Sequence, residues 1–70
     1  MLNLKESDIE FIKDNISEDS ILLQTNDIGI FLDALDEWIA QFGWDETGEN
    51  LSDLGREAQR IYDYVYYELD

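Results

Sequence analysis

Apolar side chains recur every three or four positions in the middle of this 70-residue chain, and this repeat constrains the fold more than any other feature. The repeat runs without a break through Ile28, Phe31, Leu32, Leu35, Trp38, Ile39 and Phe42. At about 100° per residue, these side chains fall within about 120° of arc on one side of an α-helix. The pattern therefore predicts a core helix over about 27–42, with Thr25 or Asn26 as its N-cap.

The residues after this helix predict how it ends. Gly43 is placed to adopt the left-handed conformation that follows many helices, and Trp44 would then pack on Ile39 in a Schellman motif. The acidic linker 44–49 is short, and short connections join neighbouring antiparallel helices. The next helix is therefore expected to return alongside the first.

A second long helix is predicted over about 51–69, with Asn50 or Ser52 as its cap. Its inner face is expected to carry Leu51, Leu54, Ala58, Ile61, Tyr62, Val65 and Leu69, with Tyr66 beside them. These positions repeat at three and four residues, as the buried side of an amphipathic helix does. Tyr64 and Tyr67 are expected to project outward.

The N-terminal part predicts a shorter helix near 8–15 and an ambiguous segment after it. Ser7 and Glu10 have the spacing of a capping box, and Asn15 is a plausible terminator. Residues 17–25 are ambiguous, because Ser17-Glu18-Asp19-Ser20 could cap a short helix or form a turn that leads into an extended Ile21-Leu22-Leu23. Helix or turn is slightly favoured, because a lone strand would need a partner and the sequence contains no second strand-like segment.

Together these elements predict an all-α fold, a small three-helix domain that occupies residues 1–70. The last two helices would form an antiparallel pair that the first helix crosses. The sequence contains no cysteine and no histidine, which excludes disulfides and the usual ligand sets for zinc, haem and iron–sulfur clusters. Packing alone must stabilise the domain, and the aromatic residues supply much of the apolar area.

Charge is the second strong feature of the sequence. Eighteen carboxylates against four basic side chains give a net charge of −14, and no Lys or Arg occurs between Lys13 and Arg56. Such a chain repels nucleic acids and anionic membranes, so direct binding to either is not expected. No basic segment leading into a long apolar run is present at the start, and a cytoplasmic location is the expectation.

The sequence offers little for catalysis or for ion binding. It contains no nucleophile paired with a base and no glycine loop for phosphate, so no enzymatic activity and no cofactor are expected. The acidic linker fails the calcium-loop pattern: with Asp45 at position 1, position 3 is Thr47 and position 12 is Arg56. A solvated acidic linker is the simpler interpretation.

Two surfaces are candidates for binding a partner. Glu49, Asp53 and Glu57 recur every four residues and would form a row about 6 Å apart on the last helix. With Asp33, Asp36 and Glu37, this row would form an acidic surface that resembles a nucleic-acid backbone. The alternative is a solvated helix face that Arg56 and Arg60 partly neutralise.

The second candidate surface is aromatic. Tyr64 and Tyr67 lie four and seven residues after Arg60 on the outer face of the predicted helix. There they would stack with the guanidinium group or contact a partner. Exposed tyrosines are also common without any partner.

Part of the chain resembles a known group of proteins. Gly43-Trp44-Asp45-Glu46 and the stretch from Leu51-Ser52-Asp53-Leu54-Gly55-Arg56 to Asp63 resemble small acidic proteins of Gram-positive bacteria and their phages or mobile elements. The resemblance covers about half of the chain. It implies a helical fold and a bacterial or phage setting, and it implies no active site.

The predicted function is therefore non-catalytic protein–protein interaction. One alternative is inhibition of a basic nucleic-acid-binding protein by charge mimicry, and another is a structural role as a small homo-oligomer. The sequence features that separate them are the tyrosine pair for a partner contact and the uninterrupted acidic middle for mimicry.

Overall fold

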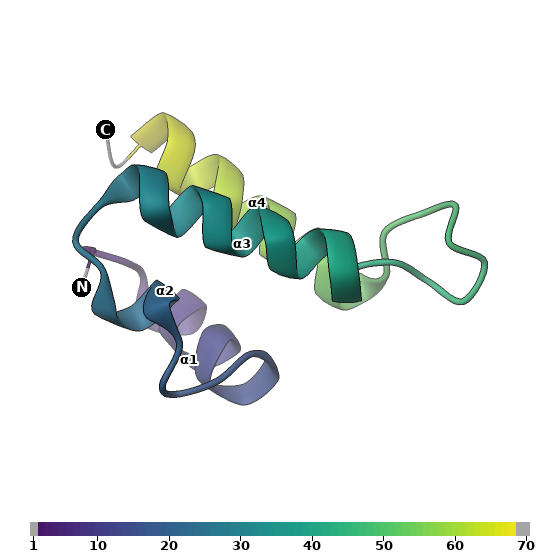
Figure 1. The fold of residues 1–70 in the computed structure, drawn as a ribbon, viewed down its shortest axis with the longest axis horizontal. Coiled ribbons are helices and arrows are strands. Elements are labelled where there is room, and N and C mark those ends of the chain that lie inside the picture. Colours follow the sequence, from purple (N-terminus) through teal and green to yellow (C-terminus); the bar gives the residue numbers. More distant parts are fainter. Residues whose placement is uncertain (1, 69–70) are drawn as a thin grey trace.

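The computed structural model describes residues 2–68, and Figure 1 shows them as helices joined by short loops. The elements are α1 (Glu6–Asn15), α2 (Ile21–Gln24), α3 (Ile28–Phe42) and α4 (Asp53–Glu68). Within the described range no strand is present, and the only β pairing is an isolated antiparallel bridge between Trp44 and Leu51. The all-α prediction is confirmed. Leu69, predicted on the inner face of the last helix, lies outside the described residues.

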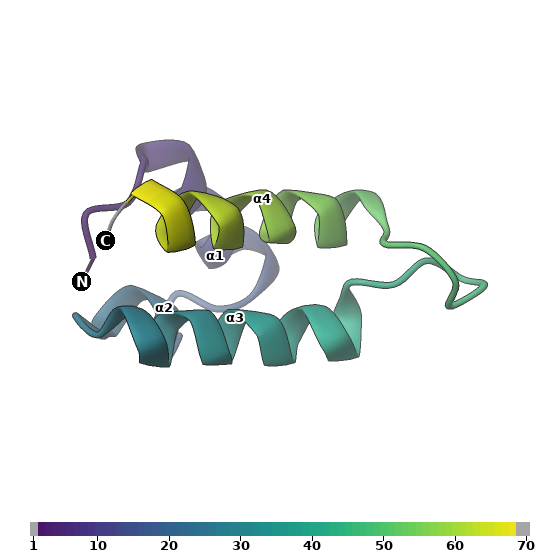
Figure 2. The same ribbon diagram turned by 90° about the horizontal axis from the view of Figure 1, so that it is seen from above.

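Helices α3 and α4 form the predicted antiparallel pair, and α1 and α2 lie together on one side of it (Figure 2). The two long helices approach most closely where α3 ends and α4 begins. A Cβ atom added to Gly55 would lie 2.0 Å from the carbonyl oxygen of Gly43, so only glycine allows this approach. The amide of Ser52 donates to the same oxygen at 2.8 Å and fastens the start of α4 to the end of α3.

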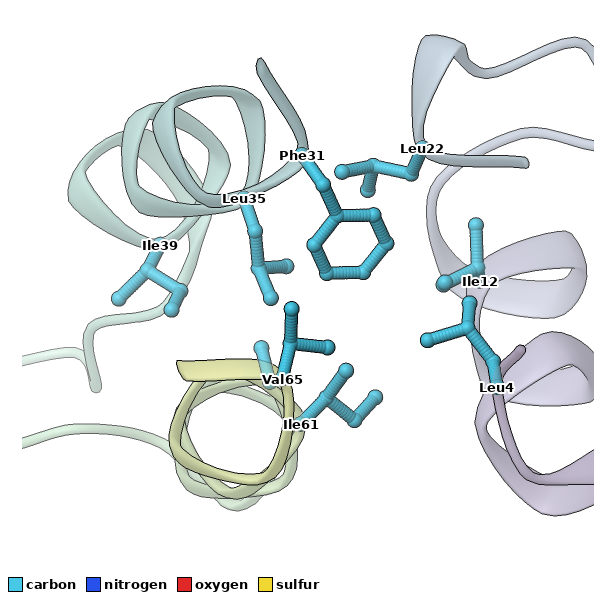
Figure 3. Packing of buried hydrophobic residues seen from close by; sticks show 9 residues of the cluster. Leu4, Ile12, Leu22, Phe31, Leu35, Ile39, Ile61 and Val65 are labelled. Carbon is cyan, nitrogen blue, oxygen red and sulfur yellow. The ribbon is translucent and has the colours of Figure 1, made fainter. Parts of the chain in front are cut away.

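The core lies between the helix pair and the two N-terminal helices. Figure 3 shows the ring of Phe31 at its centre, with side chains from every helix directed toward it. The buried apolar residues are Leu4, Ile12, Leu22, Phe31, Leu35, Ile39, Ala58, Ile61 and Val65. Their spacing within α3 and α4 is three or four residues, as the apolar repeat predicts.

The ambiguous segment contains one helical turn, α2, and tertiary packing explains it. The hydroxyl of Ser20 accepts a hydrogen bond from the amide of Leu22 at 3.0 Å, which caps the turn. The side chain of Leu22 is only 1% exposed because it enters the core, whereas Ile21 is 49% exposed. Burial of the Leu22 side chain in the core therefore stabilises this single helical turn.

Two predicted helix starts are wrong in detail. Helix α1 begins at Glu6, and its N-cap Lys5 makes no side-chain capping bond, so Ser7 lies inside the first turn instead of before it. The chain is fixed there by other contacts, because Leu4 is buried and the Lys5 ammonium lies 4.4 Å from the ring centre of Tyr64. Helix α3 is capped by Asp27, whose carboxylate accepts from the amide of Ile30 at 3.1 Å.

The residue predicted to cap α3 has another role. The hydroxyl of Thr25 accepts a hydrogen bond from the amide of Asp27 at 3.0 Å, and Thr25 is buried. Thr25 therefore orients the connection between α2 and α3, and Asp27 is the N-cap of α3. At the start of α4 the prediction of Ser52 is correct, because its hydroxyl accepts from the amide of Gly55 at 3.1 Å.

The predicted Schellman motif after α3 is absent. Gly43 has φ −89° and stays in the right-handed region, so its amide simply continues the helical pattern by donating to the Ile39 carbonyl at 2.8 Å. Trp44 is 46% exposed, and its indole N–H donates to the Ala40 carbonyl at 3.1 Å. The positive φ of this region occurs later, at Gly48, with φ 74°.

Three side chains assigned to the inner faces are exposed. Phe42 is 63% exposed, Leu54 46% and Tyr66 56%. Phe42 and Leu54 lie where the Gly43–Gly55 contact brings the two helices together, and α1 ends at Asn15 without covering them. The apolar repeat therefore extends beyond the part of the helix pair that the N-terminal helices bury.

Candidate functional site

The side chains left exposed at this end of the molecule surround a groove. One hollow of about 220 Å³ lies between α2 and α3, and a second of about 410 Å³ lies between the ends of α1 and α3 and the start of α4. The two hollows share Ile16, Trp38 and Phe42 in their walls, so they adjoin and are taken together as one groove. We call it the Phe42 groove and define it by Asn15, Ile16, Ser20, Ile21, Leu22, Ala34, Glu37, Trp38, Gln41, Phe42 and Leu54.

A row of three aromatic rings leads from α1 to the groove, and the last two, Trp38 and Phe42, line it. Phe11 of α1 meets Trp38 edge to face, with ring centres 6.2 Å apart, and Trp38 meets Phe42 at 6.0 Å. Phe11 and Trp38 are half-buried and pack against the core, whereas Phe42 stands at the rim. The rigid part of the row thus holds the exposed ring in place, which lowers the entropy lost when a partner covers it.

The one charged side chain that lines the groove is negative. Every groove residue lies between Lys13 and Arg56, where the chain has no Lys or Arg. Glu37 lines the groove directly, and Asp14, Glu18 and Asp19 lie next to its residues in the chain. In residues 2–68 the one ion pair joins Arg60 to Glu57, outside the groove.

The structure places only part of the predicted acidic surface as expected. Asp33, Asp36 and Glu37 are exposed on α3. The prediction that Glu49, Asp53 and Glu57 form a row on one helix is wrong. Ser52 caps α4, so Glu49 lies in the preceding loop. Glu57 is half-buried and paired with Arg60, so it is partly neutralised as the alternative interpretation expected.

The acidic linker is an ordered turn. One oxygen of Asp45 accepts hydrogen bonds from the Thr47 hydroxyl at 2.7 Å and from the amides of Thr47 and Gly48 at 3.0 Å. The Thr47 hydroxyl, followed by these amides, holds the pKa of the Asp45 carboxyl below its ordinary value. Within residues 2–68 no group of three acidic side chains has the arrangement of a metal site.

The predicted tyrosine site is not brought together. Tyr64 is half-buried against the core beneath the Lys5 ammonium, and Arg60 pairs with Glu57 rather than stacking on either tyrosine. Tyr67 is 74% exposed and meets Tyr66 edge to face at 4.8 Å. The side chains available for a partner here are therefore Tyr66 and Tyr67.

Sequence reasoning missed the groove because Phe42 and Leu54 continue the apolar repeats of their helices. A signal for it was present in Gly43 and Gly55, which flank the helix ends and mark a close approach of backbones. A close approach at one end leaves no room for large side chains between the helices there, so apolar residues beside it must point outward or be covered by another segment.

A scan against protein-family models and searches of curated proteins and of solved structures find no match for this chain. The resemblance of the C-terminal half to small acidic bacterial and phage proteins stays a prediction. Among the described residues, no helix has the length and apolar character that a membrane crossing requires.

Proposed function

We propose that this chain is a non-catalytic protein–protein interaction module that binds its partner through the Phe42 groove. The observation that carries the proposal is Phe42 itself, which is 63% exposed at the junction of two hollows. Leu54 and Ile21 line the same groove and are each nearly half exposed. A contiguous apolar patch with a rim of polar residues is typical of a protein-binding surface.

The energetics favour a covered groove. Complete burial of one Phe or Leu side chain stabilises by about 1.5–3 kcal/mol. Phe42, Leu54 and Ile21 retain roughly half of that surface for a partner. Their combined burial would contribute about 2–5 kcal/mol at the centre of an interface, the size of contribution that binding hot spots make.

The polar residues of the groove support a binding role over a catalytic one. Glu37 is the only titratable side chain among the groove residues. Nucleophilic catalysis typically pairs a nucleophile with an adjacent base, and the groove residues include no His, Cys or Lys for such a pair. The other polar residues, Asn15, Ser20 and Gln41, are suited to hydrogen bonds at the edge of an interface.

The test is affinity capture with two matched variants, followed by measurement of affinity for the main captured protein. Phe42→Ala and Tyr67→Ala each remove an exposed aromatic ring, so neither is expected to unfold the domain. Phe42→Ala should weaken the complex by at least about tenfold, whereas Tyr67→Ala should leave it within about twofold. The opposite pattern would place the contact at the tyrosines and refute the groove.

The same experiment addresses the other proposals. The captured partner could be a nucleic-acid-binding protein that DNA displaces and that binds the Phe42→Ala variant normally. The exposed carboxylates Asp33, Asp36 and Glu37 would then be the binding surface, and this result would favour mimicry. Self-association is opposed by the net charge of −14 on each copy. Sedimentation of the purified chain distinguishes a monomer from an oligomer directly, and a dimer at low salt would support the homo-oligomer.

A further inference from the structure

We infer that the occupant of the Phe42 groove is a short amphipathic helix of another protein, with apolar anchors on one face and basic residues on both flanks. The inference rests on the proposed function and names its partner. Three features of the groove carry it: the length of its α3 wall, the helices that supply most of its lining, and the absence of Lys and Arg from that lining.

The length of the groove fits about two helical turns. Helix α3 contributes its wall from Ala34 to Phe42, eight residues apart. At about 1.5 Å per residue, this wall is about 12 Å long. Apolar anchors at positions i, i+4 and i+7 of a bound helix span about 10.5 Å by the same rise. Three anchors therefore cover most of the length of this α3 wall.

The walls favour a helical occupant. They come from α1, α2, α3 and the first turn of α4, and ridges of helical side chains leave grooves that accept another helix. An extended peptide that binds by strand addition would instead need an open sheet edge. The part of the chain that the structure describes offers no such edge, because its only β pairing is the Trp44–Leu51 bridge.

Charge defines the flanks of the occupant. Glu37 lies in the groove wall, and no Lys or Arg lines the groove. In the chain, Asp14 and Asp53 directly precede the lining residues Asn15 and Leu54, and the nearest basic residues, Lys13 and Arg56, each stand two positions from them. Lys or Arg beside the anchors would lie within the distance of about 8 Å over which charges act at physiological salt. Acidic flanks would be repelled. A second copy of this chain has a net charge of −14 and so is disfavoured as the occupant.

Apolar anchors and basic flanks have separable effects. Burial of the anchors against Trp38 and Phe42 gives most of the affinity and a slow dissociation. The basic flanks raise the association rate and select against acidic competitors, and their effect weakens as salt increases. A peptide that has both features must therefore bind better than one that has only the charge.

The experiment uses a designed 16-residue peptide with Leu at i, i+4 and i+7 and Lys on both flanks, together with three controls. The controls are a scrambled peptide of the same composition, a peptide with Glu in place of Lys, and a peptide with one central Pro. The reporter is the fluorescence of Trp38 in a chain that carries Trp44→Phe, since the sequence has only two tryptophans. Circular dichroism first verifies that each variant of the chain is folded.

The designed peptide should shift Trp38 emission to the blue and bind at least about tenfold more tightly than each control. Phe42→Ala or Ile21→Ala in the chain should weaken binding by about tenfold, and Tyr67→Ala should change it by less than about twofold. Equal binding of the scrambled peptide would mean charge attraction alone, and equal binding of the Pro peptide would mean an extended occupant. Either result, preference for the acidic peptide, or no binding at all overturns the inference. The proposed function is tested separately, and it fails if Phe42→Ala does not weaken binding of the captured partner.

Discussion

The contact between Gly43 and Gly55 gives the sharpest test of the helix pairing. In Gly55→Ala, the new Cβ atom would lie 2.0 Å from the Gly43 carbonyl oxygen and 2.7 Å from its carbonyl carbon. These are backbone atoms, so no side-chain rotation relieves the overlap. Ordinary contact begins at 3.4 Å, so the two helix ends must separate by about 1.4 Å.

The cost of this separation exceeds the benefit of alanine in a helix. Overpacking costs about 1–3 kcal/mol, and loss of the Ser52 amide bond to the Gly43 oxygen adds about 0.5–1.5 kcal/mol. The helix propensity of alanine over glycine returns about 1 kcal/mol. The net expectation is a loss of about 1–3 kcal/mol, from a total that is roughly 4–10 kcal/mol for a domain of this length.

Thermal unfolding followed by far-ultraviolet circular dichroism measures this loss. Gly55→Ala should lower Tm by at least about 5 °C. Gly29→Ala is the matched control, because its Cβ would meet no backbone atom and only the capping oxygen of Asp27, at 3.2 Å, which need shift by only a few tenths of an ångström. The control should therefore change Tm by less than Gly55→Ala does. A Gly55→Ala chain as stable as the parent would refute the close approach of α3 and α4.

Three further predictions concern the core and the charges. Leu35→Ala, at a fully buried position, should destabilise by about 2–5 kcal/mol in urea unfolding, and a change below about 1 kcal/mol would contradict the core assignment. Salt at about 0.5 M should raise Tm by screening carboxylate repulsion, and a flat Tm would show that repulsion does not limit stability. The Asp45 carboxyl has a lowered pKa in the fold, so its contribution to stability is present above the unfolded pKa and is lost as pH falls through the folded pKa. Thr47→Val, which removes the largest cause of that shift, should raise the Asp45 pKa in an NMR titration, and an unchanged pKa would contradict the assigned hydrogen bond.

The long helices were predictable because their stability comes from patterns within one segment. The repeat from Ile28 to Ile39 identifies the buried side of α3, and Ala58, Ile61 and Val65 identify that of α4. The helical structure of α2 could not be predicted in this way. It has a single turn, and the burial of Leu22 against other helices decides its structure.

The groove was not predictable because it depends on where elements end relative to one another. Phe42 continues the repeat of α3, and only the end of α1 at Asn15 and the Gly43–Gly55 contact leave it uncovered. The tyrosine hypothesis depended on the same unknown geometry. The Lys5 ammonium covers Tyr64 from a segment nearly sixty residues away in the sequence, which no local pattern indicates.

The central claim is that this chain binds a partner protein through the Phe42 groove. Two-dimensional ¹H–¹⁵N NMR of the labelled chain during titration with its captured partner tests the claim most directly. We expect the largest shifts at the amides of Ile21, Phe42 and Leu54 and at the indole N–H of Trp38, which line the groove. Tyr67 and the outer carboxylates of α3 should change little. Shifts centred on Tyr66 and Tyr67, or on Asp33 and Asp36, with the Trp38 indole unchanged, would contradict it.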